Sequence, residues 1–189
     1  MIAGEPGIPT QRLPLLGDLV GKTLEGAIRY SWLPGPEACS EYALAEGDVF
    51  ELTAGPLLLT FSGGVTVGVS SQPSLDSIVV WDESRSDDPL ALDAELSPIV
   101  ACDPVYSRDA ICQLVGQSVV SIRIHSRSDF DEPVREVPGE VAVELVFETG
   151  DRLFMGHGLH DGSDDFAVLD GSREHQRRTV QTQVVGQDS

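Results

Sequence analysis

Two stretches of the chain, residues 19–29 (LVGKTLEGAIR) and residues 114–124 (LVGQSVVSIRI), nearly repeat one another 95 positions apart. The residues before them also correspond: PLLGDLVG (14–21) and DAICQLVG (109–116) each predict a short helix that closes at a glycine. Ser107 is the predicted N-cap of the second helix. A strand with alternating apolar residues is predicted to follow in each half. A chain with such an internal repeat is expected to fold as two related units.

A second correspondence lies further along each half. Residues 56–69 (PLLLTFSGGVTVGV) and 142–155 (AVELVFETGDRLFM) have apolar residues at alternate positions on both sides of a turn glycine, in phase at an offset of 86 positions. This pattern predicts a β-hairpin in each half, with a two-residue turn at Gly63-Gly64 in the first. One further strand is predicted to end each half, at residues 77–83 and 166–170.

These correspondences predict a β-rich α+β protein, built by tandem duplication of a short-helix plus antiparallel β-meander unit in a pseudo-twofold arrangement. The predicted boundaries are 1–83 for the first unit, 84–106 for an acidic, proline-containing linker with a short strand, 107–171 for the second unit, and 172–189 for a mobile tail or a late edge strand. Each unit alone would have a marginal core. The units are therefore expected to pack together, as one body or as two abutting lobes.

The charge is strongly one-sided, with 31 acidic and 12 basic residues and a formal net charge of −19. A field of this sign repels nucleic acid and anionic membranes and attracts basic partners, although solubility alone is the alternative interpretation. The sequence has no apolar run of about eighteen residues and no visible secretory signal. We therefore expect a cytoplasmic protein, and the composition is typical of a GC-rich bacterial genome.

No nucleophile elbow, phosphate-binding loop, dinucleotide fingerprint or HExxH motif is present, so no catalytic residue and no cofactor are predicted. Cys39, Cys102 and Cys112 form no CxxC pair and are expected to be reduced.

The loop HGLHDGSDD (157–165) is a candidate metal site. His157, His160 and Asp161 are residue types that bind zinc, and the spaced acids also resemble the start of a calcium loop. Glycine and aspartate are equally common in polar hairpin loops, which is the interpretation we prefer. No metal site is therefore predicted.

Candidate partner-binding residues are one aromatic side chain and several acids in predicted loops. Trp32 follows the first strand at the edge of a proline-rich loop, where it either continues the buried face of that strand or forms an exposed binding hot spot. The acids surround the linker, follow the second-half strand, or lie in the late loop. The candidates are Trp32, Asp82, Glu83, Asp87, Asp88, Asp129, Asp131, Glu132, Asp164 and Asp165.

The absence of catalytic and cofactor motifs favours a protein that works by binding protein. The leading expectation is an acidic binding or inhibitory module, most concretely a bacterial immunity-type protein that neutralises a basic toxin or nuclease by occluding its active site. One alternative is a metal-dependent or hydrolytic enzyme with a site between the two repeats. Another is a structural or assembly subunit that pairs through its sheet edges. No direct contact with nucleic acid or membrane is expected.

Overall fold

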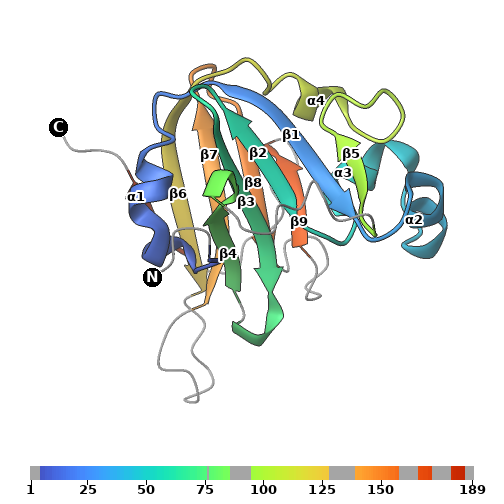
Figure 1. The fold of residues 1–189 in the computed structure, drawn as a ribbon, viewed down its shortest axis with the longest axis horizontal. Helices are drawn as coiled ribbons and strands as arrows, with labels where there is room; N and C mark the ends of the chain where they lie inside the picture. The colour runs from blue at the N-terminus through green and yellow to red at the C-terminus, as the bar shows by residue number, and fades with distance from the viewer. Residues whose placement is uncertain are drawn as a thin grey trace.

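The computed structural model describes residues 5–75, 77–85, 95–127, 139–157, 166–171 and 180–185. Figure 1 shows strands in two overlapping layers with short helices at the periphery. The helices (α) and 3-10 helices (η) are η1 (Pro9–Arg12), α1 (Leu13–Gly17), α2 (Gly35–Glu41), η2 (Glu46–Asp48), α3 (Val49–Leu52), η3 (Pro73–Leu75), η4 (Glu83–Arg85) and α4 (Asp109–Cys112). The strands are β1 (Leu24–Ser31), β2 (Leu57–Phe61), β3 (Val65–Gln72), β4 (Ser77–Asp82), β5 (Ser97–Val100), β6 (Val119–Arg127), β7 (Glu140–Phe147), β8 (Arg152–His157), β9 (Phe166–Asp170) and β10 (Val180–Val185).

The strands form two antiparallel five-stranded sheets, ordered β4-β3-β2-β1-β5 and β10-β6-β7-β8-β9. The predicted β-rich α+β class is therefore confirmed. The second sheet, read from its other edge, runs β9-β8-β7-β6-β10, which matches the first strand for strand. Residues 180–185, within the predicted tail, form the edge strand β10 beside β6. The tandem duplication and the pseudo-twofold arrangement stay predictions.

The two sheets are joined where β1 and β6 begin, at the top of Figure 1. The Gly21 N–H donates to the Val119 carbonyl and the Gly116 N–H to the Leu24 carbonyl, both at 2.8 Å. Gly21 and Gly116 have φ values of 83° and 93°, a region that residues with a Cβ disfavour. The same junction holds Lys22, whose Nζ donates to a backbone carbonyl of the first hairpin at 3.3 Å. The glycines of the sequence repeat therefore lie at the junction between the sheets.

The apolar faces of both sheets contribute to one continuous core. The predicted alternation is confirmed in the two hairpins, since the residues expected on one face are buried, except Val65 at the first turn, which is half-buried. Burying each such side chain contributes about 1.5–3 kcal/mol. Because one cluster contains residues from both sheets, the sheets form one body and not two lobes. The shared-core residues of β2 and β7 are Leu57, Leu59, Phe61, Val143, Leu145 and Phe147.

Two local predictions were wrong. Phe61 pairs with Val65, so the first hairpin has a three-residue loop, in which both turn glycines have positive φ. Three-residue hairpin loops place a residue in the left-handed region, which the second glycine satisfies. Arg108, not Ser107, is the N-cap of α4, and its side chain makes no capping hydrogen bond.

Cys102 and Cys112 form a disulfide, so the expectation of reduced thiols was wrong for this pair, and Cys39 is free. The loop that the bond closes supports α2 and α3 through Tyr106. A Cβ on Gly35 in α2 would lie 2.6 Å from the Tyr106 ring, so only glycine fits there. The Phe50 N–H of α3 donates to the Tyr106 carbonyl at 2.8 Å. The disulfide therefore stabilises the loop that α2 and α3 contact.

Replacing both cysteines of the disulfide with serine is expected to lower the free energy of unfolding by about 2–3 kcal/mol, because the unfolded chain regains the freedom of the closed loop. Urea denaturation measures the loss, and amide hydrogen exchange should rise first in α2 and α3. Cys39→Ser is the matched control and should leave both measurements near the wild-type values. Unchanged exchange in the two helices would contradict the supporting role of the loop.

Arg29 of β1 is a fully buried cation between the sheets. Its Nη2 donates to the Phe166 carbonyl at 2.6 Å and to the Thr53 carbonyl, and its guanidinium lies 4.4 Å from the Phe166 ring centroid. Its Nε and Nη1 have no hydrogen-bond partner among the described residues. Burial lowers the pKa of the Arg29 guanidinium to about 9. The residue links β1, the end of α3 and β9 at an electrostatic cost.

The lowered pKa of Arg29 predicts a pH dependence of stability. Below pH 9 both the folded and unfolded states hold the proton and the cost of burying the charge is complete, whereas above it folding releases a proton and the cost falls. The free energy of unfolding of the wild type, relative to Arg29→Met, should therefore rise by about 1.4 kcal/mol between pH 8 and pH 10. Urea denaturation at both pH values measures this difference. A constant difference would mean that the guanidinium stays protonated.

Candidate functional site

An open cavity of about 460 Å³ lies just beyond the end of β1, over α2. Trp32 is 55% exposed, the largest value among the exposed large hydrophobic side chains of the described residues, and Tyr42 is 36% exposed. Two glutamates complete the rim, and no basic residue of the described part of the chain lines the cavity. We call this cavity the aromatic–acid pocket; its lining residues are Trp32, Leu33, Glu37, Ser40, Glu41 and Tyr42.

The backbone on both sides of Trp32 is held in place. The Trp32 N–H donates to the Ala54 carbonyl at 3.3 Å. The Ser31 hydroxyl is 2.6 Å from the Thr53 hydroxyl and accepts a hydrogen bond from the Leu33 N–H at 3.2 Å. These hydrogen bonds fix the backbone at the end of β1, from which the exposed Trp32 side chain extends.

The glutamates come from a single face of α2. Glu37 and Glu41 are four positions apart, so both project from the same side of the helix. Like charges at this spacing destabilise a helix by about 0.2–0.5 kcal/mol. Neither has an ion-pair partner among the described residues. The chain thus keeps an unfavourable pair of negative charges beside two exposed rings. In the sequence, the two glutamates and the tyrosine of residues 37–42 (EACSEY) are the signal for this arrangement, which the sequence-based prediction did not use.

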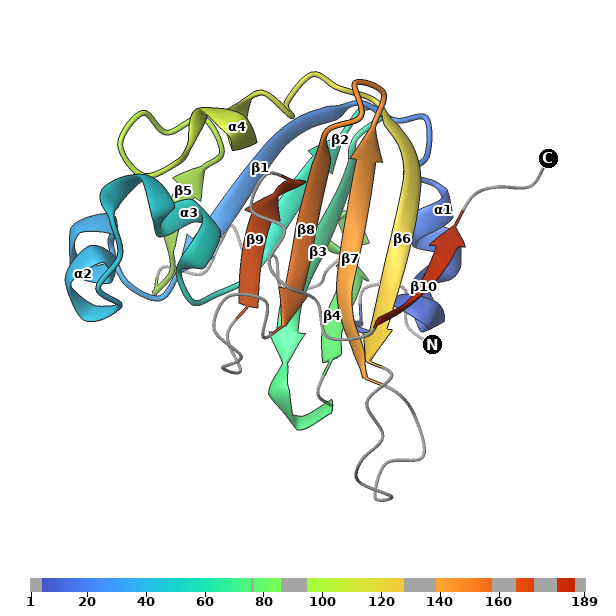
Figure 2. The ribbon, with the colours of Figure 1, turned by 180° about the vertical axis from the view of Figure 1, so that it is seen from behind.

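The neighbouring acids of this region are neutralised. Arg108 Nη2 lies 2.5 Å from Asp48 Oδ1, and its Nε lies 3.3 Å from Glu51 Oε2. Arg108 lies within the disulfide loop, so the loop that contacts α2 and α3 also supplies the cation that pairs with the acids of η2 and α3. Figure 2 shows these helices at the far end of β1 from the sheet junction. Glu37 and Glu41, by contrast, are exposed.

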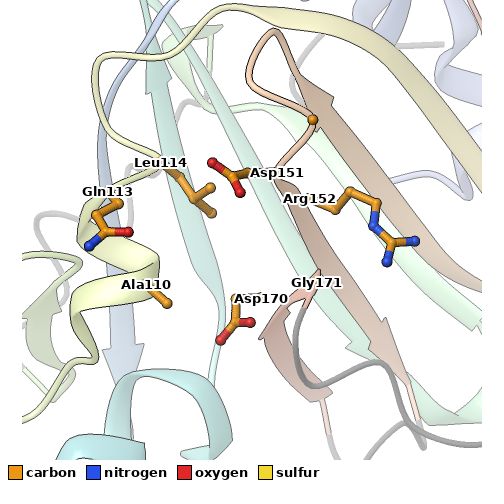
Figure 3. Close-up of a pocket in the computed structure, with 8 residues that line it drawn as sticks. Ala110, Gln113, Leu114, Asp151, Arg152, Asp170 and Gly171 are labelled. Carbon is orange, nitrogen blue, oxygen red and sulfur yellow. The ribbon is translucent and has the colours of Figure 1, made fainter.

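A second cavity, of about 260 Å³, lies between α4 and the ends of β8 and β9. In Figure 3, Gln113, Asp151 and Asp170 surround the hollow, while the side chain of Arg152 points away from it. Hydrogen bonds from Thr149 and then Gln117 lower the pKa of Asp151, so this carboxylate stays ionised at neutral pH. This cavity is also acidic, but it has no exposed aromatic ring.

A polar cluster that sequence reasoning missed lies on the outer face of the second sheet. His125 Nε2 is 2.8 Å from Glu144 Oε2, and Thr182 Oγ1 is 3.1 Å from His125 Nδ1. His125 and Glu144 are buried, and Arg123 lies 3.4 Å from the same carboxylate. Thr182 and His125 are direct cross-strand partners, and neither described cavity includes the cluster. We interpret it as a stabilising ladder across β10, β6 and β7.

Three of the ten predicted partner-binding residues lie within the described residues. Trp32 is exposed in the aromatic–acid pocket. Asp82 pairs with Arg85 at 3.2 Å. Glu83 is buried and accepts a hydrogen bond from the Trp81 indole. The pKa of Tyr30 is raised first by the burial of Tyr30 and second by the negative charge of Glu83. The remaining acidic candidates lie outside the described residues: Asp87, Asp88, Asp129, Asp131, Glu132, Asp164 and Asp165.

The proposed metal ligands are only partly visible. His157 is buried, and its Nδ1 lies 2.7 Å from the Ser71 hydroxyl, which ties β8 to β3. His160 and Asp161 lie outside the described residues. Within the described ranges no group of three histidine, cysteine, aspartate or glutamate residues is placed to hold a metal ion. No helix in the same ranges is long and apolar enough to cross a membrane.

The aromatic–acid pocket therefore combines two exposed aromatic rings with two exposed carboxylates. Its rings and carboxylates point outward from a rigid base, and its charge has the sign of the whole chain. A scan against protein-family models gives no match, and neither the curated proteins nor the solved structures contain a match to this chain.

Proposed function

We propose that the protein is an acidic protein-binding or inhibitory module whose docking surface is the aromatic–acid pocket. In its most concrete form it is a bacterial immunity-type protein that neutralises a basic toxin or nuclease. The observation that carries the proposal is an exposed tryptophan beside two carboxylates that lack a basic partner among the described residues. Exposed aromatic anchors with a charged rim have the composition of protein-binding hot spots.

Inhibition would work by occlusion. The net charge of −19 attracts a basic surface over long range and orients the encounter. Trp32 and Tyr42 then lose water against the partner, while Glu37 and Glu41 pair with the cations that a nuclease uses to hold phosphate. The pocket is carried on a projecting helix at one end of the sheets, which suits insertion into a cleft. The same charge disfavours direct binding of nucleic acid.

The enzyme alternative receives less support. Both described cavities lie outside the junction between the sheets, where a site between two repeats would be expected. Their linings contain carboxylates, an amide and a serine, but no histidine or cysteine.

We also propose that the chain is a tandem duplication with a pseudo-twofold arrangement. The equal strand orders support it, and so do paired hydrogen bonds at the junction. The Leu24 N–H donates to the Gln117 carbonyl and the Val119 N–H to the Lys22 carbonyl, both at 2.9 Å. The two bonds are equivalent under the 95-residue offset of the sequence repeat, because Val119 corresponds to Leu24 and Gln117 corresponds to Lys22. The pocket lies in the connection between β1 and β2, where the first unit is longer than the second.

A cytoplasmic location belongs to the same proposal, and the Cys102–Cys112 disulfide bears on it. Cytosolic thiols are generally kept reduced, so in this location the bond would be one that responds to the redox state of the cell. The loop that it closes supports α2, so the redox state of the compartment acts on the docking surface.

A panel of basic bacterial nucleases provides the test, with binding measured by isothermal titration and inhibition by nuclease assay. At least one nuclease should bind and lose activity, with an affinity that weakens as NaCl rises, because screening reduces attraction between charges. Trp32→Ala should weaken binding by about 30-fold, the effect of losing a hot-spot residue.

Leu75→Ala, which truncates another exposed apolar side chain, is the matched control and should bind like the wild type. A salt-independent affinity would remove the electrostatic part of the proposal. Equal losses in Trp32→Ala and Leu75→Ala would remove the pocket as the docking surface.

A further inference from the structure

We propose that the aromatic–acid pocket binds a guanidinium group, the side chain of an arginine on the protein partner, between the Trp32 and Tyr42 rings and against Glu37 and Glu41. This inference rests on the proposed function, and it names the chemical group that the docking surface recognises. It follows from the volume of the pocket, from the aromatic and acidic side chains that line it, and from the contacts that other guanidinium groups make in the same chain.

The aromatic walls favour a cation with a flat, weakly hydrated head. Tryptophan is the best aromatic partner of a cation, and arginine stacks on aromatic faces more often than lysine. The cavity of about 460 Å³ has room for a planar head group together with part of its aliphatic stem. Leu33 and the ring edges supply apolar surface for that stem.

The carboxylates supply the opposite charge in a fixed arrangement. Glu37 and Glu41 project from adjacent turns of α2, so a group with several N–H donors is able to contact both at once. Binding a cation there also relieves the repulsion between the two glutamates. A compact ammonium carries charge but lacks the planar fork of donors that two separated carboxylates match.

Other parts of the same chain show both halves of this recognition. Arg108 bridges two carboxylates, those of Asp48 and Glu51. Arg29 lies over an aromatic ring, with its guanidinium carbon 4.4 Å from the Phe166 centroid. The pocket combines the same elements, two carboxylates and aromatic faces, but none of the described arginines lines it. The missing element is the guanidinium.

The pocket is also preorganised. Tyr106 packs on Gly35 at the start of α2, and the Ser31–Thr53 contact fixes the end of β1. A rigid site loses little conformational freedom when it binds, so even a single arginine side chain is expected to bind measurably.

The experiment titrates the full-length protein with N-acetyl-arginine amide and follows the indole N–H resonances by NMR. The buried Trp81 is an internal reference. The Trp32 resonance should shift and saturate while that of Trp81 stays still. N-acetyl-citrulline amide, which has the same shape but no charge, should bind at least about tenfold more weakly, and N-acetyl-lysine amide should also bind more weakly.

The variants test the walls and the carboxylates separately. Glu37→Gln combined with Glu41→Gln should weaken arginine binding by about tenfold or more, because it removes both charges and leaves the rings. Glu25→Gln, an exposed acid on β1, is the matched control and should bind like the wild type. Tyr42→Ala should weaken binding without changing the fold, which circular dichroism checks.

Three results would overturn the inference: equal binding of citrulline, equal or tighter binding of lysine, or no effect of the double glutamine variant. Self-association that this variant abolishes would also overturn it, because the occupant would then be a second copy of this chain. If a basic nuclease binds through Trp32 while arginine does not, only the guanidinium assignment fails. If arginine binds while no basic protein does, the assignment of the pocket as a guanidinium site is supported and the proposed function is wrong.

Discussion

The packing of two apolar sheet faces against one another is the interaction on which the rest of the structure depends. Each sheet presents one row of inward apolar side chains that it cannot bury alone, and the two rows form a single core. Backbone hydrogen bonds at Gly21 and Gly116 fix how the sheets meet. The opposite end of β1 is thereby held as a rigid base, from which the short helices and the aromatic–acid pocket project.

The sequence predicted what depends on local periodicity, and missed what depends on contacts across the fold. Strand alternation predicted the strands of the two hairpins correctly, because side-chain direction along a strand has a period of two residues, but it did not predict the three-residue loop of the first. Trp32 continues the alternation of the buried Tyr30, yet it is exposed, because β1 ends at Ser31. The Cys102–Cys112 bond depends on how a loop returns to α4, which spacing alone did not reveal.

The distribution of the few cations gives the acidic surface its character. Arg108 neutralises two acids behind the pocket, and Arg123 and Arg152 lie beside the buried Glu144. Arg29 is used entirely inside, against backbone carbonyls and a ring. The basic residues named here are thus engaged in structural contacts, and within the described residues no cation neutralises the carboxylates of the aromatic–acid pocket. An acidic composition becomes a directed surface only through this allocation.

Lys22, at the junction of the sheets, is the only lysine of the chain, since every other basic side chain is arginine. It precedes β1, whereas Trp32 follows it, so a strand length of roughly 25 Å separates them. Apart from the terminal amine, reagents that acylate amines have one side chain to modify. A dye, biotin or solid support coupled there would sit at the joined end of the sheets and leave the opposite end facing solution.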